Sequence, residues 1–288
     1  MTPPTPLTRL ETAEALDGPL CEELATLAQR CIVGHSDNRP VNAELVRSRL
    51  TNALTQAPPI LVLARSGDKL VGSCAIRTPE PSEPQARQWG PIIHPNVRRF
   101  GLGTRLLRRA VGAVDWPLVS TDVPTDRTWR RRVLRWRRVG VLQTSTVLRG
   151  DPTHGEIEAT DATSVGDLDA YVARAARRYG GRDQYFADMT LRRWRDDARF
   201  RPQTLFLDPP TGSLLLTLAQ RNGSTSELLL AELWAATGAQ RTLIGSARAA
   251  AGRHGLQEVR VVTVADPAIF TASGLRATGT CQTFALDR

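Results

Sequence analysis

The sequence lacks the features that define several classes of protein. Its longest clean apolar run is Ile60–Ala64, far short of the roughly 18 residues that a membrane-spanning helix needs. Residues 1–6 have neither a basic head nor an apolar core, so they predict no signal peptide. The four cysteines, at positions 21, 31, 74 and 281, form no CxxC pair and have no histidine partner. We therefore expect a cytoplasmic protein with reduced thiols, no metal and no membrane partner.

Lysine is almost absent, and the positive charge is uneven. Lys69 is the one lysine among 38 basic residues, and the formal net charge is +9. Residues 1–150 carry all of this excess, whereas the basic and acidic residues of 151–288 balance. A basic half of this kind favours an anionic ligand: a phosphorylated cofactor, a nucleic acid or an acidic substrate. Arginines that serve only as solvated surface cations explain the same charge equally well.

The chain contains 288 residues, of which 41 % are hydrophobic, enough for two domains of ordinary size. Periodicity predicts the same order of elements twice. In the first half we expect helices at 21–31, 43–54, 103–114 and 125–138, and strands at 60–64, 70–77, 87–94, 118–123 and 141–148. In the second half we expect an extended, strand-like segment at 156–162 and helices at 165–178, 190–197, 242–254 and 267–273. The strands expected there are at 204–208, 213–219, 227–235, 259–264 and 277–285. The predicted fold class is therefore α/β (α+β), with one domain at 1–150 and a similar one at 151–288.

One segment, residues 91–104, carries a chemical signal. An apolar strand enters a loop with Arg98 and Arg99, then Gly101 and Gly103, and a helix follows. Glycine lets backbone N–H groups approach an anion closely, and a helix N-terminus favours negative charge. The loop therefore predicts a phosphate or pyrophosphate site. The GxGxxG and Walker patterns of nucleotide-binding folds are absent.

The string Arg98-x-x-Gly101-x-Gly103 resembles the Q/R-x-x-G-x-G/A pyrophosphate loop of the GNAT superfamily, whose members are acyl-CoA-dependent N-acyltransferases. The order of strands and helices around it is similar as well. In the second half, residues 235–240 occupy the matching place, with Ala235 for the arginine and Gln240 for the second glycine. The whole chain thus resembles a tandem GNAT protein of the mycothiol-synthase-like type, each domain a mixed, mostly antiparallel sheet flanked by helices. The resemblance implies an intact acyl-CoA domain at 1–150 and a degenerate one at 151–288.

The resemblance also implies roles for particular residues. Acetyl-CoA, or another acyl-CoA, is the expected co-substrate, and a small-molecule amine is the expected acceptor, attacking directly in a ternary complex. The cofactor-binding residues would be Pro91, Ile92 and Ile93 on the strand, and Arg98, Arg99, Phe100, Gly101, Leu102, Gly103 and Thr104 in the loop. A backbone N–H near Ile93 would stabilise the oxyanion. His94 and Asp122 are the candidate bases, although a strand end and a helix cap are their plainer interpretations.

Several alternatives remain open on the sequence alone. The basic first half also fits an aminoacyl-tRNA-dependent transferase, the one interpretation that involves a nucleic acid. Trp136 replaces the tyrosine that family members use as general acid, so a non-catalytic acyl-CoA-binding module is a third possibility. Tyr171, Tyr179 and Tyr185 predict either an acceptor cleft or plain helix contacts. The oligomeric state is not predicted.

Overall fold

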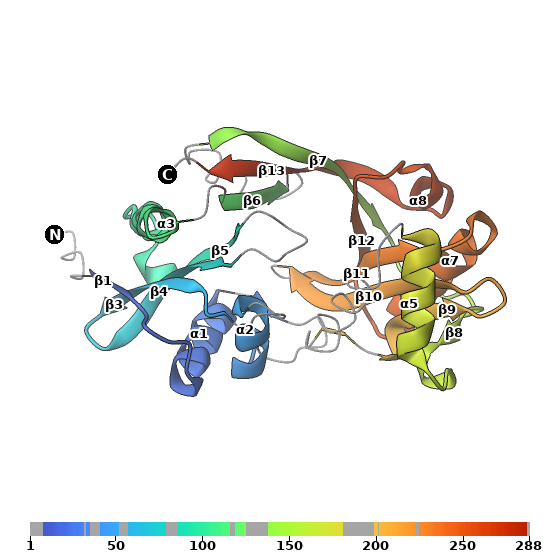
Figure 1. Ribbon diagram of the computed structural model, residues 1–288, viewed down its shortest axis with the longest axis horizontal. Coiled ribbons are helices and arrows are strands. Elements are labelled where there is room, and N and C mark those ends of the chain that lie inside the picture. Colours follow the sequence, from blue (N-terminus) through green and yellow to red (C-terminus); the bar gives the residue numbers. More distant parts are fainter. Residues whose placement is uncertain are drawn as a thin grey trace.

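The computed structural model describes residues 8–31, 33–34, 41–51, 57–78, 86–115, 119–124, 138–180, 199–200, 202–222 and 225–286. Within these ranges no helix is both long enough and apolar enough to cross a membrane. Figure 1 shows two lobes of α/β structure, with the first half of the chain on the left and the second on the right.

The first half contains six strands before its long final one. Its elements are β1 (Thr8–Thr12), α1 (Gly18–Arg30), β2 (Val33–Gly34), α2 (Ala43–Leu50), β3 (Ile60–Ser66), β4 (Lys69–Arg77), β5 (Ala86–Ile93), a 3₁₀ turn at Pro95–Val97, α3 (Leu102–Gly112), β6 (Val119–Pro124) and β7 (Arg138–Gly150). Helix α1 begins where it does because the Asp17 carboxylate accepts a bond from Leu20 N–H at 2.9 Å.

The second half follows a similar plan. Its elements are β8 (Thr160–Asp161), a 3₁₀ turn at Ala162–Ser164, α5 (Leu168–Tyr179), a 3₁₀ turn at Pro202–Thr204, β9 (Leu205–Asp208), β10 (Ser213–Asn222), β11 (Thr225–Trp234), α7 (Thr237–Arg253), β12 (Glu258–Thr263), α8 (Ala268–Ala272) and β13 (Arg276–Leu286). Helix α5 begins at Asp167, whose carboxylate accepts from Ala170 N–H at 3.0 Å.

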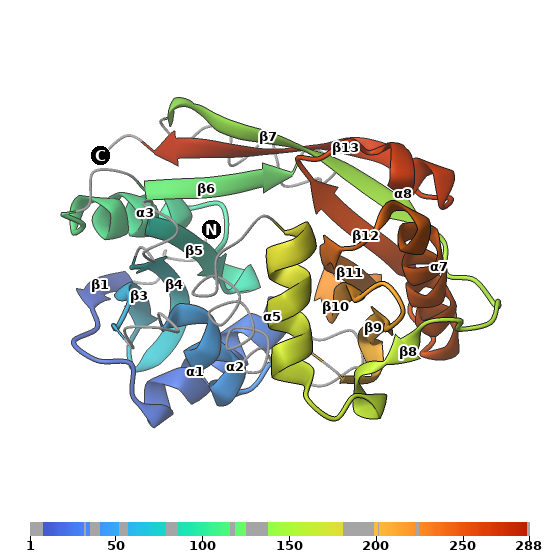
Figure 2. The same ribbon diagram turned by 45° about the vertical axis from the view of Figure 1, so that its right-hand side comes forward.

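Helices cover both faces of the sheet in each half (Figures 1 and 2). In the first half, α3 packs on one face through Leu106 and Ala110, and α1 and α2 pack on the other through Leu24 and Leu45. In the second half, the large cluster beneath α7 and α8 lies on one face, and the cluster beneath α5 lies on the other. The buried side chains therefore form a layer above and a layer below the sheet in both halves, which is the three-layer arrangement that α/β patterning predicts.

The strands form one continuous sheet in the order β1-β3-β4-β5-β6-β13-β7-β12-β11-β10-β9-β8, with β2 paired to β10. The last strand of each half, β7 in the first and β13 in the second, pairs with strands of the other half. Strand β13 lies between β6 and β7 and is antiparallel to both, and β7 lies between β13 and β12. Figure 2 shows β7 and β13 running side by side from one lobe to the other. Each half thus supplies the strand that completes the other half's sheet.

The expected fold class is confirmed, and three local expectations are corrected. Arg138 and Gly140 belong to β7, so the predicted helix at 125–138 does not extend to that point; residues 125–137 lie outside the described ranges. Helix α7 begins at Thr237 and not at 242, because Gly238 is helical. Residues 156–159 are not a strand, and only Thr160 and Asp161 pair there.

We predict that neither half folds properly alone. A fragment of residues 1–150 lacks the strand between β6 and β7, and its unpaired strand edges favour association. When 1–150 and 151–288 are co-expressed as two polypeptides, they should form a 1:1 complex by size-exclusion chromatography with light scattering. A monomeric 1–150 fragment with the circular dichroism of a folded α/β domain would contradict this exchange and would make the two halves independent units.

We predict that high pH destabilises the protein through Cys74 on β4. Burial raises the pKa of this thiol from 9.0 to about 12. Because the folded state holds the proton more tightly than the unfolded state, stability is complete below about pH 9 and falls as the pH rises towards 12, by roughly 1 kcal/mol per pH unit. Urea unfolding at several pH values should show this slope. The Cys74→Ala variant starts less stable but should lose less stability with pH, and equal slopes in both proteins would refute the assignment.

Candidate functional site

Strand β5 diverges from its parallel neighbour β6 after a short pairing. The two strands pair at Ala86 with Val119 and at Arg87 with Ser120, whereas the opposite edge of β6 pairs with β13 from Ser120 to Pro124. On its other edge β5 has a bulge, because its register with β4 shifts between Ser73 and Ala75. The bulge contains the cis peptide bond between Gly90 and Pro91. The backbone of β5 beyond this bulge is therefore no longer covered by β6.

The N–H group of Ile93 points towards this uncovered side. His94 N–H donates to Val71 O at 2.9 Å, so His94 and Val71 form a hydrogen-bonded pair of the β4–β5 ladder. The adjacent pair, Ile93 with Gly72, must then direct its backbone groups outward, because such pairs alternate in an antiparallel ladder. Ile93 N–H therefore faces away from β4, where a developing negative charge can accept from it.

The loop between β5 and α3 presents a row of free backbone donors. Arg99 and Gly101 both have positive φ, at 76° and 74°, and Gly101 caps α3 without a side-chain bond. No acceptor in the described part of the chain takes the N–H groups of residues 99–104, since the first bond of this turn is Arg105 N–H to Gly101 O at 3.1 Å. Successive N–H groups in such a turn form a concave anion site. The sequence-predicted loop is thus a cradle that fits a pyrophosphate.

Packing holds this cradle against the strand. Val97 is buried in the same core as Leu102 and Leu106. A Cβ on Gly103 would lie 3.3 Å from Pro91 Cγ, so the glycine lets α3 approach β5 closely. The structure brings the predicted strand residues, Pro91 to Ile93, and the predicted loop residues together at one place.

The Arg98 side chain does not extend freely towards the cradle. Its Nε donates to Ile93 O at 2.9 Å, and the Cys31 thiol at the end of α1 donates to the same oxygen at 3.2 Å. Burial raises the pKa of Cys31, and the Arg98 guanidinium lowers it by less, so the thiol stays protonated as a donor at neutral pH. Arg98 therefore ties the loop to the strand end in addition to supplying charge. Nothing in the sequence singles out Cys31 for this position.

The two candidate bases remain predictions. His94 Nδ1 accepts a bond from Asn96 N–H at 3.3 Å, which favours its plainer role at a strand end. Asp122 lies in β6, with its backbone opposite Thr283 of β13, so the exchanged strand contributes to its surroundings. Its side chain lies outside the described part of the structure. No group of three metal-ligating side chains occurs among the residues described.

The corresponding place in the second half has the diverging strands without the loop. Strand β11 pairs in parallel with β12 as far as Leu230 and Val261, and β11 is bulged after Leu230. Only residues 235–236 connect β11 to α7, whereas residues 94–101 connect β5 to α3. Gly238 is the second residue of α7, as Gly103 is of α3, so Gln240 is not the structural counterpart of Gly103. A two-residue connection replaces the pyrophosphate loop here, so the second half differs from the first in the length of this connection as well as in its sequence.

A cavity of about 780 Å³ occupies this second place. Apolar side chains line most of it, among them Leu230, Val261 and Phe270, and the first turn of α7 contributes Thr237, Gln240 and Arg241. In the connection, the N–H group of Ala236 donates to Ser213 Oγ at 3.0 Å. The cavity has room for a ligand, but its two-residue connection does not form the eight-residue turn that presents N–H groups in the first half.

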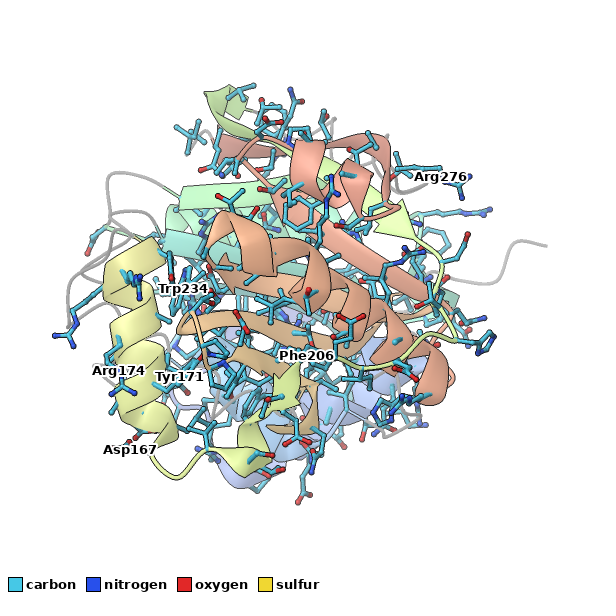
Figure 3. All side chains as sticks on the ribbon, turned by 90° about the vertical axis from the view of Figure 1, so that its right-hand side faces the viewer. Asp167, Tyr171, Arg174, Phe206, Trp234 and Arg276 are labelled. Carbon is cyan, nitrogen blue, oxygen red and sulfur yellow. The ribbon has the colours of Figure 1, made fainter. Side chains whose placement is uncertain are left out.

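The two tyrosines of α5 donate hydrogen bonds to backbone oxygens within the second half. Tyr171 is 7 % exposed and its hydroxyl donates to Ser213 O at 2.8 Å, and Tyr179 donates to Thr211 O at 2.7 Å. Figure 3 shows Tyr171 on the α5 side of the second lobe, with Trp234 nearby. Their contacts favour the plainer interpretation over an acceptor cleft. Two other residues singled out from the sequence, Tyr185 and Trp136, lie outside the described ranges.

Known structures share this fold over nearly the whole chain. A GCN5-related N-acetyltransferase from Sphaerobacter thermophilus has a TM-score of 0.56 at 17 % identity, over 96 % of this chain and 95 % of that one. A tandem GNAT protein from the clavulanic acid biosynthesis pathway has a TM-score of 0.61 at 14 % identity, over 96 % and 98 %. Saccharomyces cerevisiae N-myristoyltransferase, with bound myristoyl-CoA and inhibitors, has a TM-score of 0.58 at 10 % identity, over 97 % and 80 %. The chain therefore shares the fold of these structures.

One part of the sequence also matches a family model. Residues 22–116 match the model of the Acetyltransferase (GNAT) family, a range that contains β5, the loop and α3. No curated protein sequence matches this chain. The family match covers about a third of the chain, and the likeness to solved tandem GNAT structures extends over nearly all of it.

We predict that Arg98→Ala weakens acyl-CoA binding about tenfold, because a charged hydrogen bond that fixes the loop is lost along with the charge. Arg108→Ala is the matched control, since it removes the same charge from the exposed side of α3. Calorimetry measures the affinity of both variants, and their melting temperatures are compared. The comparison separates the loss of the hydrogen bond that fixes the loop from the loss of charge. Equal losses of affinity in the two variants would show that Arg98 acts through its charge alone.

Proposed function

We propose that this protein transfers the acyl group of an acyl-CoA, acetyl-CoA first among them, to the amine of a small molecule. The observation that carries the proposal is the row of free N–H groups at residues 99–104, next to an outward-facing Ile93 N–H. The match of residues 22–116 to an acetyltransferase family supports the choice of an acyl-CoA donor. We propose further that residues 1–150 form the cofactor-binding domain and that residues 151–288 form a degenerate partner domain.

In this proposal the backbone performs most of the chemistry. The N–H groups of Arg99 to Thr104 hold the pyrophosphate, and Arg98 and Arg99 add positive charge. Pro91, Ile92 and Ile93 line the pantetheine arm, which brings a thioester to the uncovered side of β5. Ile93 N–H then donates to the oxyanion that forms when the amine attacks the thioester carbonyl. Holding both reactants in one complex supplies much of the rate.

A proton must leave the attacking ammonium, and a proton must reach the departing thiolate. His94 and Asp122 are our candidates for the base, directly or through water. For His94 this requires the ring to release its bond with Asn96 N–H or to use Nε2. His94 is kept as a candidate because it directly follows Ile93, the proposed oxyanion donor, at the end of β5.

A matched pair of glycine variants tests the proposal. Gly103→Glu places a carboxylate at the second residue of α3, where it crowds Pro91 and repels a phosphate, so we expect the affinity for acetyl-CoA to fall more than a hundredfold. Gly238→Glu adds the same side chain at the second residue of α7, where a Cβ meets no atom within 4 Å, and should leave the affinity nearly intact. Calorimetry should find one site per chain in the unmodified protein, with circular dichroism confirming that each variant is folded.

Three results would overturn the proposal. Two sites per chain, or loss of binding only in Gly238→Glu, would place the cofactor domain in the second half. Absence of binding to any acyl-CoA, together with tRNA binding that weakens steeply between about 50 and 200 mM salt, would favour the aminoacyl-tRNA-dependent alternative. Binding of acyl-CoA without thiol release across a broad panel of amines would favour a non-catalytic acyl-CoA-binding module.

A further inference from the structure

Phe100 is an aromatic side chain that folding leaves in water. It is 59 % exposed, and it is the one aromatic among the four large hydrophobic residues that are exposed in the described part of the chain. The other three are Val141, Leu142 and Val264. An exposed ring of this size forgoes the stabilisation that burial would give. Its exposure therefore calls for a reason beyond the stability of the free protein.

The backbone around Phe100 fixes the ring in its exposed position. Phe100 lies between Arg99 and Gly101, both of which have positive φ, within the turn that carries the N–H groups of residues 99–104. The loop is held on both sides, by the buried Val97 and by the bond from Arg98 to Ile93 O. A ring on a loop held this firmly is not free to collapse onto the core.

The ring also has a specific set of neighbours. It belongs to the same turn as the free N–H groups of residues 99–104, and the side chains of Arg98 and Arg99 beside it are exposed. An aromatic face combined with guanidinium groups and backbone anion donors is the combination by which proteins bind nucleotides: the base stacks on the ring while the phosphates take the charged and N–H donors.

We propose that Phe100 is the stacking platform for the adenine of the acyl-CoA, so that the loop recognises the nucleotide end as well as the pyrophosphate. This inference rests on the proposed function. In coenzyme A the adenosine is attached directly to the diphosphate, so a base that leaves the cradle on its solvent side meets the ring of Phe100. The exposed Arg99 beside the ring then supplies positive charge for the 3′-phosphate of the same nucleotide. The thioester end of the ligand plays no part in this contact.

A chemical double-mutant cycle tests the contact. Calorimetry measures the affinity of the unmodified protein and of Phe100→Ala for two ligands, acetyl-CoA and S-acetyl-4′-phosphopantetheine, which has the thioester arm but no adenosine. We expect Phe100→Ala to weaken acetyl-CoA binding about tenfold, within the range that stacking a base on an aromatic ring contributes, and to leave the shorter ligand unaffected. Phe100→Trp should keep the affinity for acetyl-CoA.

Val264→Ala is the matched control, since it removes another exposed apolar side chain, here from the second half, and should change neither affinity. An equal loss for both ligands in Phe100→Ala would show that the residue shapes the cradle, and it would overturn the stacking role. Unchanged affinity for both ligands would overturn it as well. If the unmodified protein binds neither ligand, the proposed function itself fails, and this result is distinct from a failure of Phe100 alone.

Discussion

The pairing of β7 with β13 is the interaction on which the rest of the molecule depends. Each of these strands is long enough to serve both lobes, and each lies between two partners, so neither lobe has a complete sheet without the other. Because β13 pairs with β6, the region beside Asp122 contains residues from both halves of the chain. The exchange also removes two strand edges that would otherwise expose unpaired backbone groups. It thereby stabilises the sheet and completes the surroundings of the candidate site.

The two lobes share a framework and differ in one connection. Both contain parallel strands that diverge after a short pairing and a bulge on the strand that precedes the helix. The first lobe then uses eight residues to reach its helix and gains a cradle of free N–H groups, whereas the second uses two. That difference in loop length separates a lobe with a row of N–H groups along an eight-residue turn from one whose connection is too short to form such a turn. The proposed functional difference between the lobes therefore depends on one loop, because both lobes share the framework around it.

Much of the site was predictable because its determinants are local. Gly101 and Gly103, two arginines and an apolar strand before a helix lie within one short segment, and local glycine chemistry suffices to indicate an anion cradle. The direction of the Arg98 side chain was not predictable, because it depends on Ile93 O and on Cys31, which comes from a separate helix. The start of α7 was misplaced for a similar reason. Gly238 suggests a loop by composition, but in the folded chain it is the second residue of a helix.

The sequence by itself determined the order of elements, the basic character of the first half and the position of the pyrophosphate loop, because periodicity, charge and glycine spacing act over a few residues. Only the tertiary structure decided that β13 crosses to the first lobe, since that pairing joins residues about 140 positions apart and leaves no local signature. It also decided that Ile93 N–H faces the uncovered side of β5, because the direction of a backbone donor follows from the register with β4. The local sequence was enough to identify the loop, whereas long-range strand pairing determined which backbone donors lie beside it.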